Sequence, residues 1–188
     1  MNFIEKVKKN NKRITKYEKL INKTKSLITK NILFEKSFPM KSNYNPIIPL
    51  NIFQTWHSKT LPTNMAKAVI KIKKLNPRFT YYLFDDTDCE KFIGNHFKPD
   101  VLDAYRSLIP GAYKADLWRY CVLFIKGGIY LDIKYKQHNN LRFINLMEQE
   151  HFCLDIDGSN IYNAVMICNK GNKSCLKSIR QIVKHVQT

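Results

Sequence analysis

From residue 50 onward, short runs of β-branched and aromatic residues alternate with segments of helical periodicity. Chains that alternate in this way fold as a mostly parallel sheet with helices packed on its faces. We therefore expect one α/β domain of this class. The predicted strands are residues 50–56, 79–86, 129–135, 151–157 and 163–169, and the predicted helices are 65–76, 87–97, 99–108, 111–128 and 173–186.

Local signals mark the ends of two of these helices. Thr87 followed by Glu90 three residues later predicts a capping box at the start of helix 87–97. Gly127 is expected to end helix 111–128, because glycine readily adopts the left-handed conformation that closes a helix.

The first part of the chain has a different composition. Val7, Ile14, Ile21 and Ile28 recur every seven residues on a lysine-rich background, which is typical of a helix with one apolar stripe. We expect residues 1–42 to form a basic helical extension and linker, and residues 43–188 to form the folded domain. A helix packed on the domain, or a partly ordered arm, is favoured over the alternative, which is peripheral membrane contact through residues 1–41.

The formal net charge of the chain is +17, of which residues 1–41 contribute +9. The excess is nearly all lysine and no nucleic-acid-binding motif is present, so nucleic acid is not the expected partner. The five cysteines form no CxxC pair, which predicts free thiols, and Cys121 and Cys153 are expected to be buried. Without an apolar signal region or a membrane-length apolar run, the expected location is intracellular, either cytoplasmic or peripheral to a membrane.

Ligands of open α/β sheets bind beyond the carboxyl ends of the strands. Trp56, the pair Asp85 and Asp86, and Asp132 occupy those ends in three separate segments. We therefore expect these side chains to converge on one cleft, as in an enzyme.

Asp132 follows two glycines and an aliphatic strand. A carboxylate at a strand end can hold a hard divalent cation, which in turn can hold a diphosphate. Side chains two residues apart lie on one face of a strand, so residue 134 is where a second carboxylate would complete the site, and it is Lys134. A lysine ammonium can balance phosphate charge itself, or it can simply extend into solvent.

Asp116 and Arg119 lie three residues apart in the preceding helix, so both side chains can reach the space near Asp132. The alternative is an ordinary local ion pair worth only a few tenths of a kcal/mol. Trp56 offers a flat ring on which a nucleobase can stack, although a tryptophan is more often part of a core.

The order of these residues resembles a known family. The segment AYKADLWRYCVLFIKGGIYLDIKY (112–135) resembles the sugar-binding region of glycosyltransferases that include the yeast initiating α-1,6-mannosyltransferase, capsular polysaccharide enzymes and, more remotely, the clostridial glucosylating toxins. The residues that match are Ala112, Asp116, Arg119, Tyr120, Gly127, Gly128, Tyr130 and Asp132. Segments 48–62, 76–86 and 163–172 resemble further strands of the family, so the resemblance covers about residues 46–175.

The resemblance implies a glycosyltransferase-A fold with a mostly parallel, Rossmann-like sheet. It also implies a sugar-nucleotide donor, GDP-mannose or a UDP-hexose, and transfer of a hexose with retention to a glycan or protein acceptor, with mannose favoured. The alternatives are an inactive relative that binds a sugar nucleotide or a partner, and a basic binder of membrane or nucleic-acid surfaces. Family domains usually continue past the point that corresponds to Thr188, so the domain is expected to be C-terminally short or minimal.

The resemblance also implies roles for individual residues. The donor-binding set is Trp56, Asp116, Arg119, Tyr130, Asp132, Lys134 and Asn163. Trp56 would stack on the base, Tyr130 would line the pocket and Asn163 would face the reacting sugar. Asp116 and Arg119 would bind the sugar hydroxyls and the phosphate side of the donor. These two residues and Asp132 are the predicted catalytic residues.

Asp132 is in addition the expected metal ligand, and Lys134 replaces the second Asp of the family motif. Mn²⁺ or Mg²⁺ can still bind through Asp132, phosphates and water, and this is the favoured expectation; alternatively, Lys134 makes the site independent of metal. A literal Asp-x-Asp at Asp155 and Asp157 lacks the preceding Gly-Gly. We expect it in a solvated loop rather than beside the metal or the acceptor.

Overall fold

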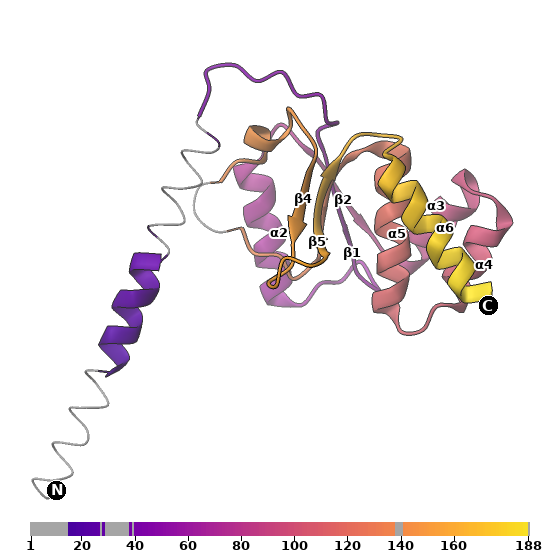
Figure 1. Ribbon diagram of the computed structural model, residues 1–188, viewed down its shortest axis with the longest axis horizontal. Helices are drawn as coiled ribbons and strands as arrows, with labels where there is room; N and C mark the ends of the chain where they lie inside the picture. The colour runs from indigo at the N-terminus through magenta and orange to yellow at the C-terminus, as the bar shows by residue number, and fades with distance from the viewer. Residues whose placement is uncertain (1–14, 27, 29–37, 39, 138–140, 188) are drawn as a thin grey trace, which may run out of the picture. The chain divides into compact units, whose positions relative to one another are not determined.

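The computed structural model describes residues 15–26, 28, 38, 40–137 and 141–187 (Figure 1). The chain divides into two compact units, Met1–Ser42 and Asn43–Thr188. In the first unit residues 15–26 are helical, and Val7 and Ile14 lie outside the described residues. None of the helices that the structure describes is both long enough and apolar enough to cross a bilayer.

The second unit alternates strands with helices. In chain order its elements are β1 (Asn51–Thr55), α2 (Thr63–Leu75), β2 (Thr80–Phe84), α3 (Asp86–His96), α4 (Pro99–Ser107), α5 (Gly111–Lys126), β3 (Gly128–Leu131), a 3-10 turn η1 (Phe143–Leu146), β4 (His151–Leu154), β5 (Ile161–Cys168) and α6 (Lys173–Gln187). The predicted order of strands and helices is therefore confirmed, and η1 is an addition to it.

Within the described residues, five strands form one sheet in the order β2-β1-β3-β5-β4. β1 pairs in parallel with β2 and β3, whereas β5 runs antiparallel to both β3 and β4. The α/β class is confirmed, and the sheet is mixed because β5 runs opposite to the other strands. This reversal brings the first half of β5 beside the carboxyl end of β3, where Leu131 pairs with Val165.

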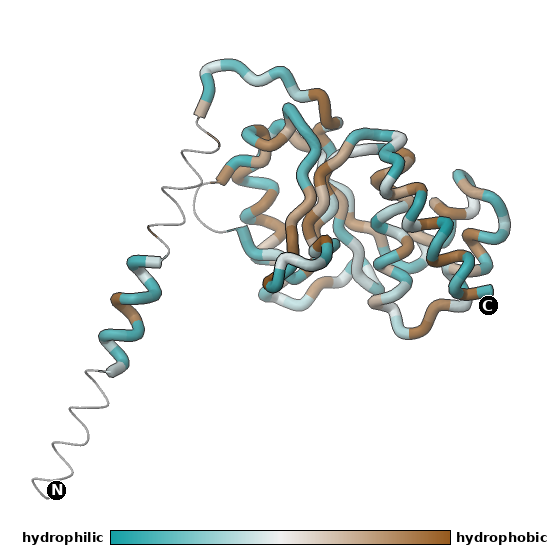
Figure 2. The backbone as a smooth tube through the Cα atoms, viewed as in Figure 1, coloured by the Kyte–Doolittle hydropathy of each residue, from teal (hydrophilic) through white to brown (hydrophobic). Residues whose placement is uncertain are grey.

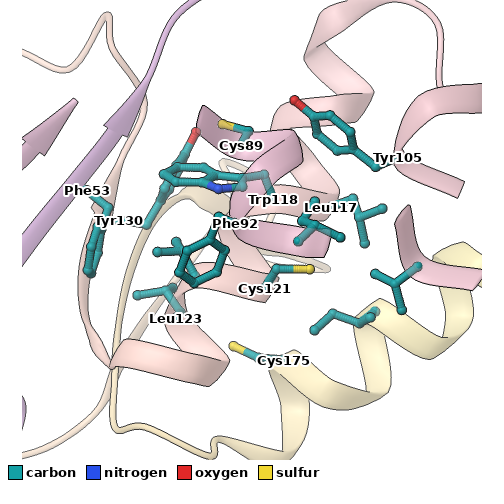
Figure 3. Packing of buried hydrophobic residues seen from close by; sticks show 14 of the residues in the cluster. Phe53, Cys89, Phe92, Tyr105, Leu117, Trp118, Cys121, Leu123, Tyr130 and Cys175 are labelled. Atoms are coloured by element: carbon teal, nitrogen blue, oxygen red, sulfur yellow. The ribbon is translucent and has the colours of Figure 1, made fainter. Parts of the chain in front are cut away.

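Helices cover both faces of the sheet: α2 lies on one face and α3 to α6 lie on the other (Figure 1). Successive side chains of a strand point to opposite faces of the sheet. In β1, Ile52 accordingly belongs to the core cluster under α2 and Phe53 to the cluster under the other helices. The larger cluster contains Trp118, whose ring packs against that of Tyr130 (Figure 3). The Trp118 ring also contacts the Phe84 ring, with centroids 4.8 Å apart. In Figure 2 the hydrophobic colouring follows the central strands, as expected for a sheet buried on both sides.

The structure corrects three local predictions. The capping box of α3 is formed by Asp85 and Asp88 rather than by Thr87 and Glu90. The chain leaves β2 at Phe84, so the helix begins one residue after Asp85, and the cap sits two residues earlier than predicted. Cys121 is buried, but Cys153 is exposed because it lies on the edge strand β4. All five cysteines are free, as expected.

The third correction concerns the strand predicted at 129–135. β3 ends at Leu131, and a turn follows in which the Tyr135 amide donates to the Asp132 carbonyl at 2.8 Å. The alternation of a strand therefore does not relate Asp132 to Lys134. Both residues lie in the turn that follows the strand.

Gly127 and Gly128 form the junction between α5 and β3. Gly127 ends the helix as predicted, with φ of 64°, and Gly128 has φ of 126°. A Cβ atom on Gly128 would lie 2.7 Å from the Asn51 carbonyl oxygen of β1, which is closer than real contacts allow. This close approach lets β3 enter the sheet directly from the helix that carries Asp116 and Arg119.

We predict that Gly128→Ala destabilises the protein by at least about 2 kcal/mol, because the new side chain meets both a disfavoured φ and the backbone of β1. Thermal unfolding should show a fall in Tm of about 2–4 °C for each kcal/mol lost. Gly111→Ala is the matched control, since a Cβ there has nothing within 4 Å. Equal Tm values for the two variants would contradict the prediction.

Candidate functional site

A cavity of about 500 Å³ opens at the carboxyl ends of β1 and β3. From β1 the chain continues to β2 on one side and later to β3 on the other, so the cavity lies at the point where the strand order reverses, the usual ligand position in such sheets. Its size is within the range of small-molecule sites. All of the donor-binding residues predicted from the sequence line it: Trp56, Asp116, Arg119, Tyr130, Asp132, Lys134 and Asn163.

Arg119 is the centre of the polar network in this cavity. Its Nη2 lies 2.9 Å from Asp116 Oδ1 and 3.3 Å from Asp132 Oδ1. Its Nη1 donates to the backbone oxygen and to Oδ1 of Asn163 at 2.8 and 3.0 Å, and its Nε donates to the Ala115 carbonyl at 3.2 Å. Three of these contacts are hydrogen bonds and the two from Nη2 are ion pairs, so all three nitrogen atoms of the guanidinium are engaged by protein oxygens.

The surroundings of Arg119 make this network rigid. Its side chain is 5% exposed, and its guanidinium carbon lies 4.5 Å from the centre of the Tyr130 ring, a cation–π arrangement. A buried arginine is stable only when its charge is paired and its N–H groups are bonded. Asp116 and Asp132 supply the charge, and Asn163 and Ala115 supply the remaining acceptors. The network thereby fixes α5, β3 and β5 relative to one another.

Asp132 is held from several sides but keeps access to the cavity. The Tyr130 hydroxyl donates to its Oδ1 at 2.9 Å. Its amide donates to the Ala164 carbonyl at 2.9 Å, and its carbonyl accepts from Gln54 Nε2 at 3.0 Å. Its side chain is nevertheless 44% exposed. The carboxylate is therefore positioned through one oxygen and presented to a ligand through the other.

The pKa of Asp116 is raised above its usual value. Burial is the largest cause, and the negative charge of Asp132 acts in the same direction. Arg119 and the hydrogen bond from Asn163, at 3.2 Å from Nδ2 to Oδ1, lower the pKa but do not outweigh burial. Burial also raises the pKa of Tyr130, so its hydroxyl stays protonated and serves as a donor to Asp132.

The two tryptophans occupy different environments. Both line the cavity, but Trp118 is fully buried as part of the core. Trp56 lies directly after β1, is half-buried at the cavity wall and packs against His57 with ring centroids 4.8 Å apart. Trp56 is thus the more exposed of the two tryptophan rings at the cavity.

The carboxylates do not form a two-carboxylate metal site. Oδ1 of Asp116 and Oδ1 of Asp132 are both engaged by Arg119, and Lys134 occupies the turn beside Asp132. Within the described residues no group of three or more His, Cys, Asp or Glu side chains is arranged to hold a metal ion. The protein oxygens left to Mn²⁺ or Mg²⁺ are the second carboxylate oxygens of Asp116 and Asp132, and both acids lie beside the Arg119 guanidinium, whose positive charge opposes a bound cation. The metal expected at Asp132 stays a prediction.

The second Asp-x-Asp lies in the turn between β4 and β5, outside the lining of the cavity. Asp157 is exposed and accepts hydrogen bonds from the amide and hydroxyl of Ser159 at 2.9 and 2.6 Å, which together with Asp155 lower its pKa to about 2. As expected, these acids belong to a solvated loop.

Three residues at the site were not assigned a role from the sequence. Gln54 is buried and links the Asp132 carbonyl to the Tyr81 hydroxyl, which donates to it at 2.8 Å. Lys114 and Tyr162 line the cavity. A buried glutamine in an otherwise apolar strand, two residues before Trp56, was a usable signal. The position of Tyr162 depends on how β5 pairs, and Lys114 lies in the first turn of α5.

Comparison with known proteins identifies the family of the chain. The family model for the glycosyltransferase sugar-binding region containing a DXD motif matches residues 62–157, just over half of the chain. An initiation-specific alpha-1,6-mannosyltransferase of Candida albicans is 36% identical over 91 residues, which cover 45% of this chain and 24% of that protein. Inositol phosphoceramide mannosyltransferase 3 of Schizosaccharomyces pombe is 30% identical over 141 residues, which cover 75% of this chain and 39% of that protein.

A glycosyltransferase of Acanthamoeba polyphaga mimivirus is 34% identical over 97 residues, which cover 50% of this chain and 39% of that protein. The chain thus spans less than half the length of these curated relatives. Among solved structures, the PaToxG glycosyltransferase has a TM-score of 0.58 at 17% identity and covers 88% of this chain and 69% of that one. This likeness confirms the predicted fold of glycosyltransferase-A type. The chain belongs to the family of glycosyltransferase sugar-binding regions that contain a DXD motif.

Proposed function

We propose that the chain is a glycosyltransferase that moves a hexose, with mannose favoured, from a sugar nucleotide to a glycan or protein acceptor. The proposal rests mainly on one observation. The half-buried Trp56, the Arg119 network and the exposed carboxylate of Asp132 all line the same cavity at the strand ends. The preference for mannose is supported by the relatives from Candida albicans and Schizosaccharomyces pombe, which are both mannosyltransferases.

In such a transfer the bond between the anomeric carbon and the diphosphate oxygen breaks, and its electron pair stays with the diphosphate. The acceptor oxygen forms the new bond to the anomeric carbon, and the acceptor proton passes to the departing diphosphate. Positive charge develops on the sugar, so the carboxylates of Asp116 and Asp132 stabilise it when they lie beside it. Retention of configuration, as implied by the resemblance, is part of the proposal.

The contacts of Arg119 favour an indirect role for this residue. Because all three of its nitrogen atoms contact protein oxygens and its side chain is 5% exposed, it can bind a phosphate only by giving up one of these contacts. We propose that Arg119 positions Asp116, Asp132 and Asn163, and that those three side chains contact the sugar.

The charge coupling within this network is testable by titration. We predict that Asp132→Asn lowers the pKa of Asp116, because it removes a negative charge that raises it. Carbon-13 NMR of the Asp116 carboxyl group measures the change. Asp103→Asn, which removes an exposed acid of α4, should leave that pKa unaltered. Since the folded-state pKa of Asp116 is raised, its stabilising contribution is present at low pH and is lost as the pH rises through that pKa.

The role of Trp56 is tested by binding. We predict that Trp56→Ala weakens binding of GDP-mannose or a UDP-hexose by about 1–3 kcal/mol, the usual value for base stacking on an aromatic ring. Isothermal titration calorimetry gives the Kd. Tyr82→Ala is the control, since it removes a partly exposed ring on β2 away from the cavity. A Kd unchanged by Trp56→Ala would remove Trp56 from the donor site.

Turnover separates an enzyme from an inactive binder. We predict that Asp132→Ala lowers donor hydrolysis or transfer by about a hundredfold or more, since it removes a preorganised charge beside the reacting sugar. Product release by liquid chromatography measures the rate. Activity that survives Asp132→Ala would refute the assigned role, and tight nucleotide binding without turnover would favour the inactive relative.

The N-terminal unit supports a second contact. In its described helix, Tyr17, Leu20, Ile21 and Ile28 are exposed among lysines, which is the composition of a helix that lies on an anionic membrane. We propose peripheral membrane contact through residues 1–41 as an accessory property of the protein.

We predict that Leu20→Asp with Ile21→Asp weakens binding to phosphatidylserine-containing vesicles at least about tenfold, because two apolar side chains no longer enter the bilayer surface. Vesicle co-sedimentation measures the loss. The control is Asn22→Asp with Ser26→Asp, which also adds two acids to the helix but at polar positions. If both double variants bind equally well, charge alone accounts for any binding.

A further inference from the structure

The cavity contains one cation that no other described side chain engages. Arg119 is paired with Asp116 and Asp132, and the Lys114 ammonium lies 5.2 Å from the centre of the Tyr105 ring. Lys134 lines the cavity, is exposed and makes no ion pair or hydrogen bond with the described residues. Its charge is therefore available to a ligand.

The charge balance of the cavity makes this cation important. Among its lining residues the carboxylates are Asp86, Asp116 and Asp132, and the lysines and arginine are Lys114, Arg119 and Lys134, so the lining carries no net charge when histidine is neutral. A nucleoside diphosphate brings at least two negative charges. These need a cation that is not already neutralised by the protein, either a divalent ion or a free side chain.

Few carboxylate oxygens at the site are left to hold a divalent ion, whereas the turn after β3 provides a free cationic side chain, Lys134. The oxygen of Asp132 that faces Arg119 and Tyr130 is already engaged. A divalent cation on the other oxygen would share the cavity with the Arg119 guanidinium, which lies 3.3 Å from Asp132 Oδ1, and with Lys134. Like charges repel, so the positive charges of these two side chains disfavour a divalent cation in this cavity.

We propose that Lys134 takes the place of the divalent cation, so that the site binds the diphosphate of its donor without metal. This inference rests on the proposed function and specifies how it works in this chain. As the bond to the sugar breaks, negative charge grows on the departing diphosphate, and the Lys134 ammonium stabilises it as a point charge. Lys134 is then a catalytic residue that contacts the leaving group.

The experiment measures binding of GDP and of UDP by calorimetry, with EDTA and with Mn²⁺, so it needs no turnover. For the wild type we expect binding in EDTA and a Kd that Mn²⁺ changes by less than about threefold. Lys134→Ala should weaken binding in EDTA by about tenfold or more, the usual value of a hydrogen bond to a charged group. Lys134→Asp should abolish binding in EDTA and restore it with Mn²⁺, because it creates the second carboxylate of a metal site.

Lys136→Asp is the matched control, since it makes the same charge change at an exposed residue outside the lining of the cavity. Its Kd in EDTA should stay within about threefold of the wild type, as expected for a screened charge. Wild-type binding that requires Mn²⁺, or a Lys134→Ala variant that binds normally in EDTA, would overturn this inference and leave the proposed function intact. If neither GDP nor UDP binds in either buffer, both this inference and the proposed function are overturned.

Discussion

The buried guanidinium of Arg119 is the interaction on which the site depends. It reaches Asp116 in its own helix, Asp132 at the end of β3 and Asn163 in β5, so one charge joins three elements that are far apart in sequence. Removing a partner from such a pair leaves an uncompensated buried charge, which is strongly destabilising. The same contacts that stabilise the domain therefore set the distances between the polar groups that face the cavity.

Antiparallel β5 is the structural requirement for this network. A parallel strand beside β3 would start at the opposite edge of the sheet, whereas β5 begins at the carboxyl end of β3 and places Asn163 two residues from the Leu131–Val165 pair. The glycine junction before β3 has the complementary effect, because it joins the end of α5 directly to the strand. The helix with Arg119 and the strand that leads to Asp132 consequently share one short connection.

The sequence predicted most of this arrangement, and its errors have local causes. Strands and helices follow from hydrophobic periodicity, and the polar residues of the site follow from their positions at strand ends. The reversed direction of β5 depends on pairing between distant segments, which periodicity does not report. The cap at Asp85 was missed because Thr87 and Glu90 satisfy the same spacing rule as Asp85 and Asp88. Asp132 and Lys134 were related by strand alternation, although β3 had already ended at Leu131.

The cavity has two parts that differ in rigidity, and this difference suits a transfer reaction. On one side the buried Arg119 network holds Asp116 and Asn163, with little freedom to rearrange. On the other side Trp56 is half-buried and Lys134 is exposed, so these side chains can adjust as a ligand enters and leaves. A preorganised group costs little reorganisation when charge develops at the sugar, while an exposed lysine on its flexible four-carbon stem can follow a departing diphosphate. Under the proposed function, the fixed carboxylates lie at the sugar and the Lys134 ammonium lies at the leaving group, so they divide the electrostatic work between them.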